Sequence, residues 1–292
     1  MGSRIVYLIL SHQFPELVHR LARVLVDESA NAYVVIHHDH DKSVLPALHS
    51  SQVHVLPEHV PTARGDMSFV HAILRGLEWI RDNLDYDWVV HVSGQDYPLV
   101  PLRQIDAALG SGRHDAYVRW SRAPEWEAQA RERYCRRWYS WKIPFRRRKR
   151  ITLSRPYNVV FTDRFRVYKS SQWWNLSRPV IDYLFEFLAR TPAYWEQYAR
   201  SFIPVESFLQ TVVLNGPFEI APWHMRYVVW AKPTDRHPQV LTMRDLPAML
   251  TSGNWFARKF NPTVCAEVLD RLDEHRHGAV GSDASNPSAP LP

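Results

Sequence analysis

The chain has 292 residues, of which 46% are hydrophobic and 23% are charged. These proportions are typical of a globular protein that buries a full core, and they exclude a chain that is disordered throughout. The formal net charge of +6 favours binding to anions, which include nucleotide diphosphates, nucleic acid and anionic membrane surfaces.

The cysteine content and the apolar runs predict the cellular location of the protein. Cys135 and Cys265 are the two cysteines, which argues against a disulfide framework and leaves room for a single bridge. The first apolar run, residues 5–10, is too short for the core of a signal peptide, and no run reaches the length of a membrane span. We therefore predict a cytoplasmic protein, and the positive charge leaves a peripheral contact with the inner face of the membrane open.

Apolar runs alternate with helical patterns along the first third of the chain. Predicted strands occupy residues 5–10, 32–36, 53–56 and 88–92. A helix that begins at Pro15 has leucines at helical spacing on one face, and a second helix is predicted over 67–80. This alternation predicts an α/β fold with a mainly parallel sheet, flanked by helices on both faces.

The rest of the chain adds further helical patterns and a biased C-terminus. Apolar spacing over 180–188 predicts a helix. Residues 277–292 are rich in Gly, Ser, Ala and Pro, which predicts a disordered tail. We expect residues 1–276 to form a single domain.

Three of the predicted strands end in polar residues: Ser11-His12, residues 37–42 and residues 93–96. In open α/β sheets, ligands bind beyond the carboxyl ends of the strands. The three clusters are therefore candidates for one binding site.

Residues 123–150 have a different composition and predict an insertion or lid. Within 131–150, arginines and a run of five basic residues alternate with Trp and Tyr. A solvated loop is the plainest interpretation. The alternatives are binding of a sugar, binding of single-stranded nucleic acid through base stacking, and binding of anionic lipid.

Glu206 is the candidate catalytic acid–base residue. Pro204 suits a helix entry, and apolar residues at helical spacing follow, which predicts a helix over 204–213. Unpaired N–H groups at a helix start favour the charged form of a carboxylate there, as a general base requires. The alternative is an ordinary acidic residue in the first turn.

Four segments, in this order along the chain, carry a resemblance to a known family: 92–99 (VSGQDYPL), 171–178 (SQWWNLSR), 204–208 (PVESF) and 256–260 (FARKF). Together they resemble the core-2/I-branching β-1,6-N-acetylglucosaminyltransferase and peptide O-xylosyltransferase family, over roughly residues 5–260. The low cysteine content is similar to that expected of a bacterial member. The resemblance implies a GT-A-like nucleotide-sugar-binding fold, an inverting mechanism, a UDP-sugar donor and no metal or other cofactor.

The resemblance also implies roles for residues on the donor side. The cations that bind the donor diphosphate correspond to Arg258 and Lys259. The nucleoside-binding acid corresponds to Asp39, which follows His37 in an Ile-His-x-Asp pattern, and both are candidate donor-binding residues. Asp96 is a further candidate for the donor pocket, with a structural role in the turn before Pro98 as the alternative.

On the acceptor side, the general base of the family corresponds to Glu206, and the acceptor-binding segment to Gln172 and Trp173. Consecutive residues of a strand point to opposite faces, so at most one of Trp173 and Trp174 can face a cleft. Arg64 precedes Gly65 where the family often has Trp, which puts the local shape of the donor side in doubt.

These roles agree with the chemistry of a single displacement. A base removes the proton of the acceptor hydroxyl, and cations stabilise the diphosphate that leaves on the opposite face. Asp39-His40-Asp41 is the competing feature, because it matches the Asp-x-Asp pattern that binds Mg²⁺ or Mn²⁺ in other nucleotide-sugar enzymes. It follows the second predicted strand, whereas the metal motif is expected at 93–96.

The sequence therefore predicts an inverting, metal-independent glycosyltransferase of polysaccharide biosynthesis. The donor is expected to be UDP-N-acetylglucosamine or UDP-xylose, and the acceptor a hydroxyl of a glycan, a glycolipid or a protein. No nucleic acid partner is expected. The alternative is a non-catalytic protein that binds nucleic acid or an anionic surface through residues 131–150.

Overall fold

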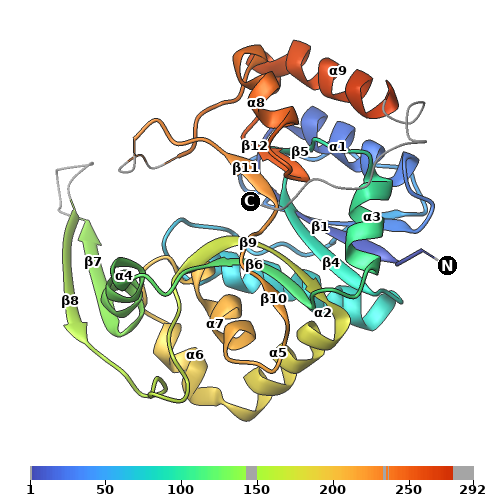
Figure 1. The fold of residues 1–292 in the computed structure, drawn as a ribbon. Coiled ribbons are helices and arrows are strands. Elements are labelled where there is room, and N and C mark those ends of the chain that lie inside the picture. Colours follow the sequence, from blue (N-terminus) through green and yellow to red (C-terminus); the bar gives the residue numbers. More distant parts are fainter. Residues whose placement is uncertain (1, 143–149, 233–234, 236, 279–292) are drawn as a thin grey trace. The chain divides into compact units, whose positions relative to one another are not determined.

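The computed structural model describes residues 2–142, 150–232, 235 and 237–278, and Figure 1 shows their helices and strands. The chain forms two compact units. Unit 1 is drawn from residues 1–59, 80–113 and 225–292, and unit 2 from residues 60–79 and 114–224. Each unit thus combines segments that are distant in the sequence, and the expectation of a single domain over 1–276 stays a prediction.

Unit 1 is built on a parallel sheet with the strand order β4-β1-β2-β3. The strands are β1 (Ile5–Ser11), β2 (Ala32–His38), β3 (Val53–Val55) and β4 (Trp88–Ser93). Every residue of β1 is buried, as expected for a parallel strand that is covered on both faces. The four strands predicted from apolar runs are present, and they are parallel as predicted.

Helices and a second sheet complete unit 1. The helices are α1 (Pro15–Asp27), α3 (Leu102–Gly110), α8 (Leu246–Leu250) and α9 (Pro262–Gly278), with a 3₁₀ turn at Met243–Asp245. The second sheet has the order β11-β12-β5, with β5 at Asp96–Pro98, β11 at Arg226–Val228 and β12 at Phe256–Arg258. Strand β12 runs antiparallel to β5, which places Arg258 opposite Asp96.

The leucine face predicted for the first helix is confirmed. Leu17, Leu21 and Leu25 of α1 are buried, and Pro15 occupies the start of the helix, where its missing N–H costs nothing. Helix α2 (Ser68–Asn83) matches the second predicted helix and runs from unit 2 into unit 1.

Unit 2 combines a small mixed sheet with an aromatic core. The sheet has the order β10-β6-β9, formed by β6 (Ala116–Trp120), β9 (Ser170–Ser177) and β10 (Ile220–Ala221). The helices are α4 (Pro124–Tyr134), α5 (Arg178–Arg190), α6 (Pro192–Tyr198) and α7 (Phe208–Leu214). The rings of Tyr194, Tyr198 and Phe208 lie 4.9 to 5.2 Å apart between centroids, so α6 and α7 pack through aromatic contacts.

The basic-aromatic stretch differs from a plain loop where the structure describes it. Residues 124–134 form α4, and β7 (Arg136–Lys142) pairs in antiparallel fashion with β8 (Arg150–Pro156), as Figure 1 shows. Aromatic residues favour strands, which accounts for β7 despite its charge. Residues 143–149 lie outside the described residues.

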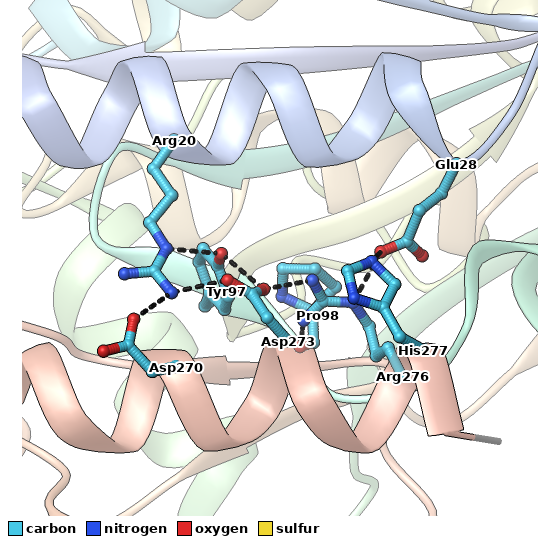
Figure 2. A network of polar contacts seen from close by, with 8 residues as sticks. All are labelled: Arg20, Glu28, Tyr97, Pro98, Asp270, Asp273, Arg276 and His277. Atoms are coloured by element: carbon cyan, nitrogen blue, oxygen red, sulfur yellow. Dashed lines mark hydrogen bonds and ion pairs between the residues drawn. The ribbon is translucent and has the colours of Figure 1, made fainter.

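Helix α9 is held in unit 1 by a network of ion pairs, shown in Figure 2. Arg20 of α1 contacts Asp270 at 2.7 Å and Asp273 at 2.5 Å, and Tyr97 of β5 donates to Asp273 at 2.8 Å. Arg276 is fully buried and contacts both Asp273 and Glu28. The network therefore joins α9 to α1 and to β5.

The C-terminal region differs slightly from the prediction. Helix α9 continues through Gly278, and residues 279–292 of the predicted tail lie outside the described residues. No helix within the described ranges combines the length and the apolar character that crossing a bilayer requires.

We predict that Asp273→Asn lowers the free energy of unfolding by about 1.5–3 kcal/mol at pH 7, the range for hydrogen bonds to charged groups. Burial acts to raise the pKa of Asp273, but hydrogen bonds from Arg20, Tyr97 and Arg276 outweigh it and hold the pKa below its usual value. The contribution of Asp273 to the free energy of unfolding is therefore fully present above the unfolded-state pKa of about 3.9. It is lost as the pH falls through the lower pKa of the folded state.

The measurement is urea unfolding of both proteins at pH 7 and near pH 3, where the difference between them should shrink. Asp270→Asn is the matched control, because Asp270 contacts the same arginine but is 64% exposed. It should cost less than about 1 kcal/mol. Equal effects of the two substitutions would contradict the role given to Asp273.

Candidate functional site

The polar ends of β1, β2 and β4 meet at one edge of the sheet in unit 1. The strand register places Ser11 beside His38, and Leu10 beside Ser93. The Ser11 hydroxyl and the His38 Nδ1 atom are 2.8 Å apart. The sequence prediction that these clusters belong to one edge is therefore confirmed for the described strands.

Gly94 allows the end of β4 to approach β1 closely. A Cβ atom at this position would lie 2.7 Å from Val18 Cγ2 and 2.8 Å from Ser11 Cβ. The next residue, Gln95, exchanges hydrogen bonds with the backbone of Phe260, each of 3.0 Å. This contact brings the 256–260 segment to the same edge of the sheet.

A buried ion pair orients Arg258 at this edge. The Nε atom of Arg258 lies 3.2 Å from the carboxylate of Asp96, which is fully buried. Asp96 also accepts hydrogen bonds from the hydroxyl and the backbone N–H of Ser93, at 2.7 and 3.1 Å. Burial raises the pKa of Asp96, and Arg258 opposes this shift. Asp96 thus has the structural role that the sequence left as an alternative, and it also positions a candidate donor-binding cation.

A second buried arginine accompanies this pair. Arg226 is fully buried and donates to the carbonyl of His91 at 2.6 Å. Burial lowers the pKa of Arg226 to about 9, and the charge of Asp96 opposes the shift. Arg226 was not predicted, because nothing in the local sequence around it distinguishes it from a surface arginine.

Lys259 and Asp39 share an electrostatic neighbourhood with His12. Burial lowers the pKa of His12, the charges of Lys42 and Lys259 lower it further, and Asp39 raises it. Asp39 is 1% exposed and forms an ion pair of 2.8 Å with Lys42. Its position beyond β2 agrees with the donor-binding role that the sequence predicts, and His12 is a further candidate at the end of β1.

His37 is buried in β2, and burial lowers its pKa to about 4. The ring is therefore neutral at physiological pH. A neutral imidazole can donate one hydrogen bond and accept another, but it cannot offer a positive charge to a phosphate. A donor-binding role for His37 stays a prediction and is restricted to hydrogen bonding or packing.

The Asp-x-Asp pattern brings possible metal ligands together. Ligand atoms of Asp39, Asp41 and His59 lie within 4.8 Å of one another. Carboxylate oxygens suit Mg²⁺ or Mn²⁺. Asp39 is already paired with Lys42, however, and Asp41 is hydrogen-bonded to His59 at 3.2 Å, so these groups also satisfy one another without a metal.

In unit 2, Glu206 ends a 3₁₀ turn at Pro204–Glu206 that precedes α7. The prediction of one helix over 204–213 is wrong in this detail, because Ser207 has non-helical dihedral angles and separates the turn from the helix. The Ser207 hydroxyl bonds instead to the carbonyl of Tyr168 at 2.6 Å and to the hydroxyl of Tyr198 at 2.7 Å. Glu206 therefore owes its position to this turn rather than to the dipole of a long helix.

The backbone before this turn is strained. Ile203 has a φ of 54°, a left-handed conformation that is rare for a β-branched residue. Its N–H donates to the carbonyl of Gly65 at 3.1 Å, which helps to hold the conformation. Strain of this kind is frequent at functional sites.

Two cations lie close to the Glu206 carboxylate. Arg133 donates to it at 2.7 Å, and both side chains are partly exposed, at 24% and 30%. Lys169 lies in its electrostatic field: burial lowers the pKa of Lys169, and Glu206 opposes the shift. Arg133 belongs to the basic stretch that the sequence singled out, but its pairing spans 73 residues and was not predicted.

The predicted acceptor residues lie on β9, next to the turn of Glu206. The side chain of Gln210 donates to the carbonyls of Ser171 and Val205, at 2.8 and 3.1 Å, which ties the start of β9 to the turn. Gln172 is half-buried, and Trp173 is only 4% exposed. Acceptor binding by these two residues stays a prediction.

The structure thus assembles the predicted residues in two groups. Unit 1 brings together the donor-side candidates, and unit 2 brings together Glu206 and the acceptor-side candidates. The first group offers fixed positive charge, and the second offers an oriented carboxylate.

Comparison with known proteins identifies the family. The sequence model of the Core-2/I-Branching enzyme family matches residues 5–250, so the chain belongs to this family. The α/β class of the fold is as expected from the sequence.

The relatives are distant. Beta-glucuronosyltransferase GlcAT14A of Arabidopsis thaliana is 24% identical over 76% of this chain and 50% of its own length. Xylosyltransferase 2 of Rattus norvegicus is 23% identical over 94% of this chain and 34% of its own. The chain spans about half the length, or less, of the curated relatives it matches.

Solved structures show weaker likeness. The galactosyltransferase LgtC in complex with donor and acceptor sugar analogues has a TM-score of 0.40 and 8% identity, with 97% of each chain covered. Mouse xyloside xylosyltransferase 1 has a TM-score of 0.41 and 8% identity, covering 87% of this chain and 97% of its own. Likeness at this level adds nothing to the assignment.

We predict that Asp96→Asn lowers the free energy of unfolding by about 3–5 kcal/mol, because it removes the negative charge that offsets the fully buried Arg226 and the mostly buried Arg258. Asp85→Asn is the control, since Asp85 of the same unit is 65% exposed and contacts an exposed arginine. That change should cost less than about 1 kcal/mol. Urea unfolding at pH 7 measures both, and similar costs would contradict the buried ion pair.

Proposed function

We propose that the chain is a glycosyltransferase that moves a sugar from a UDP-sugar to a hydroxyl group of an acceptor, with inversion and without a metal ion. Membership of the Core-2/I-Branching enzyme family supports the reaction class. The observation that carries the assignment of the base is the Glu206 carboxylate, which Arg133 orients at 2.7 Å while leaving it partly exposed.

The proposed reaction is a single displacement. Glu206 takes the proton of the acceptor hydroxyl, the oxygen attacks the anomeric carbon, and the bond from that carbon to the diphosphate oxygen breaks. The electron pair of that bond leaves with UDP. General base catalysis of this kind is worth about 10²–10⁴ in rate.

Arg258 and Lys259 are proposed to stabilise the leaving diphosphate. Arg258 is held by Asp96, so its guanidinium needs little reorganisation when the charge develops. Burial lowers the pKa of Lys259, and the charge of Arg258 lowers it further. A bound diphosphate would offset both effects, because an adjacent negative charge favours the protonated amine. This complementarity supports a role in donor binding.

The donor sugar is proposed from the names of the relatives, which are a glucuronosyltransferase and a xylosyltransferase. Xylose was already expected from the sequence as the donor sugar, and the comparison adds glucuronic acid as a candidate. N-acetylglucosamine stays a prediction. The acceptor is proposed to be a hydroxyl group of a glycan or of a protein.

The alternative of a nucleic-acid-binding protein is not favoured, because the family match includes the whole of residues 131–150.

We predict that Glu206→Gln lowers sugar transfer by about 10²–10⁴-fold, because glutamine keeps the size of the side chain but cannot accept the proton. The affinity for UDP should stay unchanged. Transfer is followed as UDP release from a panel of UDP-sugars, and UDP binding by calorimetry. Glu219→Gln is the matched control, an exposed glutamate of the same unit. Turnover by Glu206→Gln equal to that of the control would refute the assignment of the base.

The proposal also predicts that EDTA leaves the rate of transfer unchanged, since fixed cations take the place of a metal ion. The measurement compares the rate of sugar transfer after dialysis against EDTA with the rate after Mn²⁺ is added. A rate that EDTA abolishes and Mn²⁺ restores, and that Asp41→Asn weakens, would instead assign a metal to Asp39, Asp41 and His59.

A further inference from the structure

Unit 2 contains a cavity of about 300 Å³ that the reaction described above does not use. Its wall is formed by the residues around α4, with Ser121 and Arg122 before the helix, and by residues 158–169. The volume lies at the lower end of the range for small-molecule sites. The cavity is therefore large enough for about one sugar unit.

The wall of the cavity carries an excess of positive charge. Four of its side chains are cations, namely Arg122, Arg131, Arg166 and Lys169, and two are carboxylates, namely Glu127 and Asp163. Within the part of the chain that the structure describes, no ion pair joins these four cations to a carboxylate. Positive charges that outnumber the carboxylates around a cavity attract an anion to the space between them.

Lys169 connects the cavity to the candidate base. Its ammonium lies 4.1 Å from the ring centroid of Trp126, which is also part of the wall. The cation–π contact holds the long side chain in place. The cavity and the proposed base are neighbours within unit 2, because the carbonyl of Tyr168, a residue of the wall, accepts a hydrogen bond of 2.6 Å from Ser207, the residue that follows Glu206.

The other groups of the wall suit a saccharide. Trp126 and Phe161 offer apolar surface, on which the C–H face of a sugar ring can pack. Glu127 and Asp163 can accept hydrogen bonds from sugar hydroxyls. Arginine guanidinium groups form paired hydrogen bonds with a carboxylate, which fixes both its position and its orientation.

We propose that this cavity binds an acidic sugar of the acceptor, a unit with a carboxylate such as a uronic acid, next to the hydroxyl that Glu206 activates. This inference rests on the proposed function, since it assigns the acceptor of that reaction. A space for about one sugar unit fits a saccharide better than an extended acidic peptide.

The test uses the full chain without any donor. Methyl β-glucuronide, methyl β-glucoside, sodium sulfate and a glutamate-rich peptide are titrated separately, with binding followed by ligand-observed NMR. We expect the glucuronide to bind, and the neutral glucoside, which has the same ring without the carboxylate, to bind at least about tenfold more weakly, the loss expected for charge-assisted hydrogen bonds.

The double variant Arg131→Gln and Arg166→Gln should weaken glucuronide binding by at least about tenfold for the same reason. Both arginines are exposed, so the fold should tolerate the change, which an unaltered melting temperature would confirm. Arg190→Gln is the matched control, because Arg190 is a 79% exposed arginine on α5 of the same unit. It should leave glucuronide binding unchanged.

Each other outcome overturns the inference in a defined way. Equal binding of sulfate and glucuronide would reduce the cavity to a simple anion site, and stronger binding of the peptide would assign a protein acceptor. Absence of glucuronide binding in a chain that still consumes UDP-sugars would reject the inference and leave the proposed function intact. Glucuronide binding in a chain that neither binds UDP nor consumes UDP-sugars would reject the proposed function, and with it the acceptor role of the cavity.

Discussion

The ion pair between Asp96 and Arg258 is the constraint on which the arrangement of the candidate donor-binding residues depends. Asp96 is the first residue of β5, and Arg258 lies on β12, which is more than 150 residues later in the chain. Their pairing, together with the contacts between Gln95 and Phe260, brings a cationic segment to the edge where β1, β2 and β4 end. A charge that is already oriented before the ligand arrives costs little reorganisation during a reaction.

Glu206 is also held by an ion pair, but the roles of the two charges are reversed. There the arginine is the partner that orients and the carboxylate is the group proposed to react. The strained backbone at Ile203 and the hydrogen bonds of Ser207 hold the short turn in place of a long helix. The same carboxylate lies near Lys169, so the acceptor side is also rich in positive charge. Both groups of candidate residues therefore rely on a side chain held by an ion pair with a residue distant in sequence.

Much of the fold could be predicted because it follows from local patterns. The apolar runs at 5–10, 32–36 and 88–92 became β1, β2 and β4, and the leucine face of α1 is buried as expected. The sequence proposed Asp39, Asp96, Arg258 and Lys259 as donor-binding residues, and the structure places all four in one unit, while their roles stay predictions. The local pattern failed at Ser207, where side-chain hydrogen bonds to distant residues outweigh helical spacing.

The sequence by itself determined the α/β class, the strands, the family and the residue types of the candidate site, since periodicity and short motifs are properties of neighbouring residues. Only the tertiary structure decided which charges are paired: Asp96 with Arg258, Glu206 with Arg133, and Arg20 with Asp273. It also decided that four cations of unit 2 surround one cavity. The physical reason is that Coulomb interactions depend on distance in space, which chain separations of 73 to 253 residues do not reveal.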